Sequence, residues 1–393
     1  MVYVVSAVRS AIGRFGGAFK GLTPPELAAQ VMKAAVERSG IDADKLDLVI
    51  MGNVLRGGHG QLVPRQAAFL AGIPKQVDAL AIDMVCSSGM AAVMTAAAQI
   101  KAEEVDLVLA GGIESMSGAG FGLDASARWG YKYAPSGLKI VDLMARDGLS
   151  DPESGEAMGQ QTERLIEEEG VKRLELDEIA ALSNQRAATA TSSGAFADEI
   201  VGVPYRDRNE EKVLVVDEGF RADSTVDSLS MLRPAFRPDG MLTAGNSSQI
   251  SDGAAALVLA SERAVNEHGL VPIARITGSS WAAGEPYRFP EAPIPAVEKL
   301  LKKHGKSIND FDLFENNEAF ALNSVLFTRR LGVDIEALNV NGGAIALGHP
   351  IGASGARILV TLIHALRQRG GSQGLAAICH GTGGGTVTSL ELV

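Results

Sequence analysis

Two cysteines, Cys86 and Cys379, are the side chains of this 393-residue sequence most able to form a covalent bond with a substrate. Cys86 follows the mostly apolar segment 80–85 and precedes the small residues 87–89 and a helix predicted over 91–100. A thiol at the start of a helix lies near the positive end of the helix dipole and near backbone N–H groups, which favour the thiolate. A free cysteine is more often an inert core residue. The position of Cys86 therefore predicts a nucleophile.

A histidine lies in a second chemically active segment, the glycine-rich stretch 342–355 with the sequence GGAIALGHPIGASG. His349 precedes Pro350 and a helix predicted over 356–368, and it could act as a general base for Cys86 or donate to a developing oxyanion. The segment lacks the Gly-Lys-Ser/Thr ending of a nucleotide P-loop and the glycine spacing of a dinucleotide loop. A phosphate-binding role is therefore disfavoured.

Two further segments place polar groups after predicted strands. Asn317, in the segment Asn-Asn-Glu-Ala-Phe, follows a strand predicted over 312–314 and could orient a water or a substrate carbonyl, although asparagine is also a common helix cap. Cys379 lies in the segment Ile-Cys-His-Gly-Thr-Gly-Gly-Gly at the end of the last apolar strand. The glycines there allow a backbone N–H to approach a ligand, and Cys379 could relay a proton.

The elements that must position these residues occur twice. Segment 46–50 resembles 311–314, and segment 86–91 resembles 352–357, each about 265 residues further along the chain. The surrounding order also repeats: a first strand, a helix, a strand led by aspartate, a helix with a Gly/Ser start and a strand that ends in glycine. Strands that alternate with helices predict an α/β fold, here made of two similar halves.

The stretch 119–249 differs in composition from both halves and is too long for a linker. It contains a polar amphipathic helix predicted over 176–192. We expect an inserted subdomain that carries ligand specificity, because such insertions commonly do so. The predicted boundaries are 1–118 plus 250–270 for the N-terminal half, 119–249 for the insertion and 271–393 for the C-terminal half.

Composition narrows the class of protein. The formal net charge of −11 disfavours a nucleic-acid binder, which needs clustered positive charge. No run approaches the roughly 18 apolar residues of a membrane span, and the early Arg9 and the missing cleavage pattern argue against a secretion signal. Two cysteines provide neither a disulfide framework nor a thiolate-rich metal site. These features predict a cytoplasmic protein.

Four motifs in this order resemble the thiolase family over essentially the whole chain: Cys-Ser-Ser-Gly at 86–89, Asn-Glu-Ala-Phe at 317–320, Gly-His-Pro-Ile-Gly-Ala-Ser-Gly at 348–355 and Cys-x-Gly-x-Gly at 379–383. The resemblance implies two α/β halves stacked in five layers (αβαβα), with an inserted loop subdomain. It also implies a reversible acyl transfer that converts a 3-oxoacyl-CoA and CoA into an acyl-CoA and acetyl-CoA. A homodimer or homotetramer is implied, with 119–140 as a contact between copies.

The resemblance assigns roles to the catalytic positions. Cys86 carries the acyl group, His349 activates it, and Cys379 protonates the departing acetyl-CoA enolate or removes the α-proton of acetyl-CoA. One oxyanion site comes from His349 and a water held by Asn317, and the other from the backbone N–H groups of Cys86 and Gly381. His380, which the family does not require, could tune Cys379.

Coenzyme A and acyl-CoA are expected as substrates on the insertion, with no tightly bound cofactor and no metal. Arg221 matches the family position that meets the adenine nucleotide, although a solvated surface charge is the alternative. Ser248 matches the serine that contacts pantetheine, and Phe236 lines the channel. The remaining matched substrate positions are Met158, Ser228 and Ala244.

One departure bears on chain length. Family members specialised for acetoacetyl-CoA commonly carry a histidine before Met-Gly, where this sequence has Ala157. The smaller side chain favours broader or longer 3-oxoacyl-CoA substrates, and an acetoacetyl-CoA-specific acetyl-CoA C-acetyltransferase is the alternative.

Two related classes are disfavoured as well. The 3-oxoacyl carrier-protein synthases replace the second cysteine by His or Asn, whereas this chain keeps Cys379. A catalytically silent lipid-binding relative would have no need for all four motifs.

Overall fold

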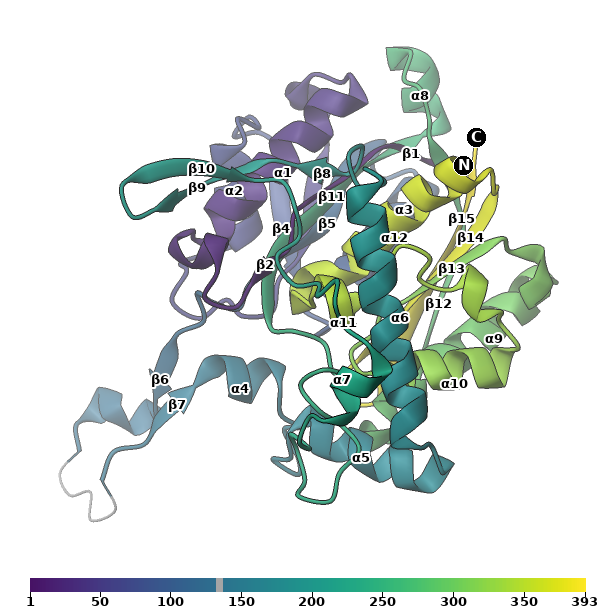
Figure 1. Cartoon of the computed structure of the whole chain (residues 1–393). Helices are drawn as coiled ribbons and strands as arrows, with labels where there is room; N and C mark the ends of the chain where they lie inside the picture. The colour runs from purple at the N-terminus through teal and green to yellow at the C-terminus, as the bar shows by residue number, and fades with distance from the viewer. Residues whose placement is uncertain (132–136) are drawn as a thin grey trace.

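The computed structural model describes residues 1–131 and 137–393. Within these residues the central element is an eleven-stranded sheet, whose main path runs β13-β14-β15-β12-β1-β11-β5-β3-β4 (Figure 1). The first half of the chain provides β1 (Val2–Ser10), β3 (Leu48–Gly52), β4 (Asp78–Ile82), β5 (Leu107–Ser115) and β11 (Ser251–Ser261). The second half provides β12 (Ala274–Ala283), β13 (Leu313–Asn316), β14 (Gln373–His380) and β15 (Gly384–Leu392).

The two halves meet where β1 pairs antiparallel with β12, at Tyr3 opposite Arg275 and Val4 opposite Ala274. Parallel pairing occurs at corresponding places in each half, between β3 and its neighbours β4 and β5 and between β13 and β14. The outer strand β4 precedes the first cysteine, and β14 contains the second. The pairing therefore supports the predicted internal repeat.

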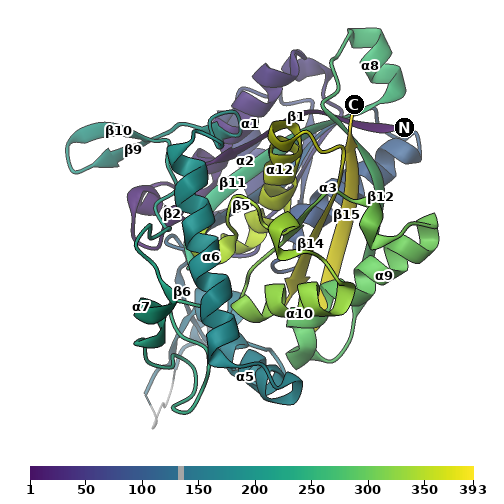
Figure 2. The same ribbon diagram turned by 45° about the vertical axis from the view of Figure 1, so that its right-hand side comes forward.

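Helices complete five layers. Between the two parts of the sheet lie α3 (Ser88–Lys101) and α12 (Ile351–Arg369), which pack against each other and share one apolar core (Figure 2). The outer face of the first half is covered by α1 (Pro24–Ser39) and α2 (Val63–Leu70). The outer face of the second half is covered by α9 (Pro293–His304) and α10 (Ala321–Leu331). This arrangement confirms the αβαβα fold class.

The central helices begin earlier than predicted. The prediction began them at Ala91 and Ala356, whereas α3 starts at Ser88 and α12 at Ile351. The Ser- and Gly-rich residues before the predicted starts resemble a loop, but here they form the first helical turns. They are helical because their small side chains let the two helices pack closely, and this tertiary contact outweighs a weak helix propensity.

The insertion leaves the first half after β5 and returns to it at β11. Its elements are β6 (Phe121–Leu123), β7 (Ile140–Asp142), α4 (Leu143–Gly148), α5 (Met158–Glu169), α6 (Arg173–Ser192), β8 (Ile200–Val201), β9 (Val203–Asp207), β10 (Glu210–Leu214) and α7 (Val226–Ser230). The β6/β7 pair projects as an arm from the body of the molecule (Figure 1). By contrast, α5 and α6 share a buried core with α10 and β13 of the second half. The insertion is thus anchored to the scaffold by apolar packing.

One further strand and two further α-helices of the described residues are short. They are β2 (Gly13–Arg14), α8 (Glu262–His268) and α11 (Ala344–Leu347). The strand β2 pairs with β11, and α11 packs against α6 just before the histidine loop. Within the described residues 1–131 and 137–393, no helix is long and apolar enough to cross a membrane.

Candidate active site

Glycines let the starts of α3 and α12 approach each other. A Cβ added at Gly89 would lie 2.9 Å from the backbone nitrogen of Ala356, and one at Gly112 would lie 2.2 Å from the carbonyl oxygen of Gly352. Real side chains do not reach such distances from backbone atoms, so these positions require glycine. The contact draws together the loop before α3, which carries Cys86, and the loop before α12.

The turn that holds Cys86 has a strained backbone and is fixed by hydrogen bonds. Val85 has φ +49°, a left-handed conformation that a β-branched residue rarely adopts. The hydroxyl of Ser88 donates to the carbonyl oxygen of Val85 at 2.6 Å and accepts from the N–H of Met84 at 2.8 Å. Ser87 donates to the carbonyl oxygen of Ile378 at 3.4 Å. These bonds fix the nucleophile turn against the strand that carries the second cysteine.

Burial dominates the ionisation of Cys86. Removal from water raises the pKa of the Cys86 thiol to about 12, although the backbone N–H groups of Gly381 and of Cys86 itself face the sulfur and oppose this rise. The expectation that the helix start favours a thiolate is therefore wrong for the free enzyme: α3 begins at Ser88, closer to Cys86 than predicted, yet desolvation outweighs the helix dipole and the backbone N–H groups. Cys86 needs a base.

His349 has the protonation state of such a base. Ser354 donates its hydroxyl proton to the carbonyl oxygen of Pro350 at 2.9 Å, so its oxygen must accept from Nδ1 of His349, 2.6 Å away. This network assigns the hydrogen to Nδ1 and leaves a lone pair on Nε2, which has no partner among residues 1–131 and 137–393. Burial first, and then the nearby charge of Arg357, lowers the pKa of His349 to about 3. The imidazole is thus neutral at physiological pH.

Asn317 carries unused hydrogen-bonding capacity in a fully buried place. Its backbone N–H donates to the carbonyl oxygen of Ala377 at 3.0 Å, which ties the segment to β14. Both polar atoms of its side chain are buried and have no hydrogen-bond partner within the described part of the chain. Because buried amides are almost always paired, this amide is suited to hold a water or a ligand oxygen.

Cys379 is completely buried. Burial raises the pKa of its thiol, and the nearby sulfur of Cys86 raises it further. The side chain of Asn323 donates to Sγ of Cys379 at 3.3 Å and opposes this rise. The suggested tuning by His380 finds no support: neighbouring side chains of a strand point to opposite faces, and the His380 ring instead bonds the carbonyl oxygen of Gly381 at 2.7 Å.

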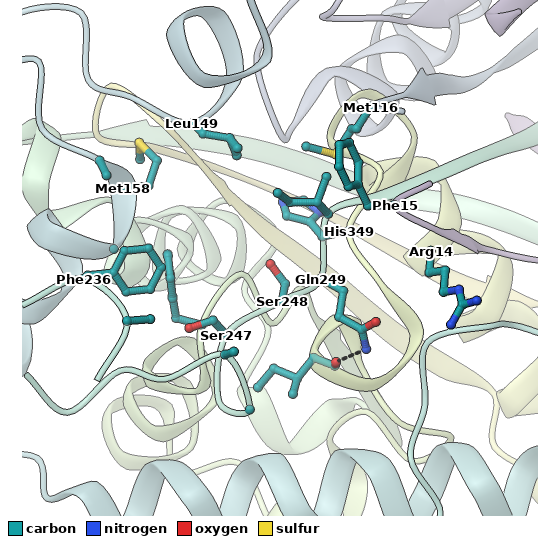
Figure 3. A pocket seen from close by; sticks show the side chains of 18 of the residues that line it. Arg14, Phe15, Met116, Leu149, Met158, Phe236, Ser247, Ser248, Gln249 and His349 are labelled. Atoms are coloured by element: carbon teal, nitrogen blue, oxygen red, sulfur yellow. Dashed lines mark hydrogen bonds between the residues drawn. The ribbon is translucent and has the colours of Figure 1, made fainter. Parts of the chain in front are cut away.

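A cavity of about 710 Å³ leads to this group of residues. Figure 3 shows Met158 and Phe236 on one side of it, and Phe15, Met116 and His349 on the other. Six of the predicted site residues line it: Met158, Arg221, Phe236, Ala244, Ser248 and His349.

The other predicted residues lie outside the lining of the cavity. The hydroxyl of Ser228 is instead engaged with Thr225 in the first turn of α7. Cys379 lies near the end of β14, and Cys86, Asn317 and Gly381 lie in loops. A Cβ added at Gly381 would lie 3.4 Å from Cε of Met158, so the glycine loop adjoins the cavity wall.

Sequence reasoning missed several residues of the site. Phe15, Met116 and Leu149 line the cavity, and Gln249 holds its floor through bonds to the carbonyl oxygens of Ile345 and Ala346. Within residues 1–131 and 137–393, no cluster of three His, Cys, Asp or Glu side chains is placed to hold a metal ion. The cavity can accept an extended, partly apolar molecule.

Comparison with known proteins gives one consistent result. The sequence pattern of the thiolase N-terminal domain matches residues 2–263, and that of the thiolase C-terminal domain matches residues 270–392. An acetyl-CoA acetyltransferase of Synechocystis sp. is 59% identical, with 100% of this chain and 99% of that protein covered. One from Escherichia coli K12 is 45% identical, with 99% and 98% covered.

The fold comparison agrees. The crystal structure of the Bacillus anthracis acetyl-CoA acetyltransferase matches with a TM-score of 0.96 at 43% identity, covering 100% of this chain and 98% of that one. Both domain patterns and full-length identities of this size show that the chain belongs to the thiolase family of acyltransferases.

Proposed function

We propose that this chain interconverts acetoacetyl-CoA plus CoA with two molecules of acetyl-CoA, through an acyl group on Cys86. The observation that carries the proposal is a site that combines a neutral imidazole, His349, whose Nε2 has no partner among the described residues, with two thiols whose neutral forms are favoured, Cys86 and the buried Cys379. The names of the full-length relatives support the same reaction.

The first half-reaction cleaves a carbon–carbon bond. Nε2 of His349 takes the Cys86 proton, and the sulfur attacks the 3-oxo carbon. The backbone N–H groups of Cys86 and Gly381 stabilise the oxyanion, a kind of contact typically worth about 100- to 1000-fold in rate. The bond between C2 and C3 breaks, and Cys379 protonates the departing enolate carbon. The enolate oxygen is held by His349, now protonated at Nε2, and by a water on Asn317.

The second half-reaction restores the enzyme. The Cys379 thiolate takes the thiol proton of CoA, and the CoA sulfur attacks the acyl carbon on Cys86. The Cys86 sulfur leaves and recovers its proton from His349. The two thiols thus exchange protons with different partners, which explains why one site needs both.

The fate of the acyl group separates these roles. In Cys86→Ala, no acetyl group should appear on the protein after incubation with acetyl-CoA, as checked by intact mass. In Cys379→Ser, Cys86 acetylation should remain measurable while acetoacetyl-CoA cleavage slows by several orders of magnitude. A trapped acetyl group on Cys86→Ala, or loss of acetylation in folded Cys379→Ser, would reject this division of labour.

Chain length is the finer part of the proposal. The expectation of longer substrates came from Ala157, which stands where acetoacetyl-CoA-specific members commonly carry a histidine. Ala157 lines the cavity, whereas the relatives are named for acetyl transfer. We favour acetoacetyl-CoA, and the preference for longer chains stays an untested prediction. Turnover of acetoacetyl-CoA against 3-oxohexanoyl- and 3-oxodecanoyl-CoA decides between them, since higher kcat/KM for a longer substrate would overturn the choice.

Assembly is proposed from the β6/β7 arm. Phe121, Leu123, Trp129 and Ile140 on this arm are 56% to 81% exposed, and an apolar cluster of this kind marks a contact surface. We propose that the arm contacts a second copy of the chain, in a homotetramer. The predicted contact segment 119–140 includes 132–136, which lie outside the described residues. A solution mass by ultracentrifugation tests the proposal, and a monomer would exclude it. The cytoplasmic location stays a prediction.

A further inference from the structure

Asn323, on the first turn of α10, has a side-chain orientation that its neighbours determine. Its Oδ1 accepts the backbone N–H of Phe320 at 2.9 Å, and its Nδ2 donates to the carbonyl oxygen of Pro290 at 3.0 Å. A flipped amide would set its oxygen against the carbonyl oxygen of Pro290 and its NH₂ group against an N–H donor. Nδ2 must therefore face Pro290, and its second hydrogen remains for another acceptor.

That acceptor is the sulfur of Cys379, 3.3 Å from Nδ2. Asn323 is 1% exposed, so bulk water does not compete for its hydrogen bond to Cys379. The backbone carbonyl oxygen of Asn323 accepts from the side chain of Asn316 at 3.1 Å, which fixes the first turn of the helix to the end of β13. The side-chain amide itself is held by Phe320, Pro290 and Cys379 before any substrate arrives.

The hydrogen bond from Asn323 affects the ionisation of the Cys379 thiol. Cys379 is buried beside Cys86, and both the loss of water and the second sulfur oppose its ionisation. A donor at fixed distance stabilises the thiolate more than the thiol, because hydrogen bonds to charged groups are the stronger ones. It also fixes the direction of Sγ.

We propose that Asn323 is a positioning residue for Cys379, whose amide orients the sulfur and favours the thiolate that removes the α-proton of acetyl-CoA. In that step the C–H bond breaks, the proton moves to the sulfur, and the electron pair stays on the α-carbon. The inference rests on the proposed function, because it assumes that Cys379 exchanges protons with this carbon. Nothing in the sequence motifs pointed to Asn323.

The test compares proton removal with acyl transfer in the same protein. Asn323→Asp keeps an acceptor for Phe320 and replaces the donor by an oxygen, whereas Asn323→Gln keeps the donor on a longer side chain. Deuterium uptake at the methyl group of acetyl-CoA in D₂O reports on Cys379, and intact mass reports on acetylation of Cys86. Thr328→Val is the control on α10, since its hydroxyl bonds only to the helix carbonyls of Ser324 and Val325.

In Asn323→Asp we expect deuterium uptake to fall about 10- to 100-fold, the size of a hydrogen bond to a charged group. The pH profile of deuterium uptake in this variant should shift to higher pH, while acetylation of Cys86 persists. Asn323→Gln should show a smaller shift in the same direction, and it decides the question if the Asp variant does not fold. Thr328→Val should match the wild type.

The outcomes separate the two proposals. Unchanged uptake and an unchanged pH profile in a folded Asn323 variant would overturn the inference alone. Equal losses of uptake and acetylation would also overturn it, because they indicate support of the whole site. If the wild-type protein showed neither acetylation nor uptake, the proposed function itself would fail.

Discussion

At the scale of single residues, the site is governed by desolvation. Cys86, His349 and Cys379 are all shifted toward their neutral forms, mainly by burial. In proteins, burial disfavours whichever form of a group carries charge. The resting site therefore holds no ion among these three residues, and charge develops only as protons move during the reaction.

The neutral histidine has a measurable consequence for stability. The pKa of His349 is about 3 in the folded protein and about 6.5 in an unfolded chain. Its contribution to the free energy of unfolding is therefore fully present above pH 6.5 and lost as pH falls toward 3. Between pH 6.5 and 4.5 this loss amounts to about 2 to 3 kcal/mol.

Urea unfolding of wild type and His349→Gln checks this prediction. At one fixed protein concentration, the unfolding free energy should fall less in the variant between pH 6.5 and 4.5, by about 2 to 3 kcal/mol. The difference between the two proteins removes the contributions of the carboxyl groups. Equal falls in both would show that His349 titrates normally in the fold.

Sequence reasoning identified the residue types at the site but could not assign their protonation states. The motifs around Cys86 and His349 were found because small residues, glycine and proline mark the turns that carry them. Desolvation of Cys86 depends on what packs over it from distant segments, and no local pattern records that. Asn323 was not predicted as a site residue for the same reason, since its partner Cys379 lies 56 residues away.

At the scale of elements, close glycine contacts set the distance between the two halves of the site. Gly112 on β5 faces the first turn of α12, and its missing side chain leaves space for the Gly352 carbonyl. The loop before that helix carries His349. The repeat predicted both central helices, but their first turns were read as loops, because the contact that makes them helical is tertiary.

Gly112→Ala should displace α12. Its Cβ would lie 2.2 Å from the carbonyl oxygen of Gly352, and a shift of about 1 Å at a catalytic group can cost about 100-fold in rate. We expect kcat/KM for acetoacetyl-CoA to fall by that order while circular dichroism stays native. Gly21→Ala is the control, because a Cβ there meets nothing within 4 Å. Wild-type kinetics in Gly112→Ala would mean that this contact does not set the position of His349.

At the scale of the whole molecule, a buried ionic network joins the insertion to the scaffold. Arg9 of β1 donates to Glu199 at 2.5 Å and to Asp217 at 2.7 Å, and all three side chains are fully buried. Thr361 of α12 also donates to Glu199, at 3.2 Å. In the sequence, Arg9 served only as a charge near the N-terminus that argued against a secretion signal. Its burial could not be predicted, because its partners lie about 200 residues away.

The network predicts a large and local stability effect. Asp217→Asn removes one of the charges that compensate Arg9, and breaking a buried ion pair from one side typically costs about 3 to 5 kcal/mol. Glu211→Gln is the matched control, since its pair with Arg206 is about 80% exposed and such pairs contribute about 0 to 1 kcal/mol. Urea unfolding at pH 7 should show the first loss and not the second. Losses of similar size would mean that Arg9 finds other compensation, and the insertion would then be held by its apolar core alone.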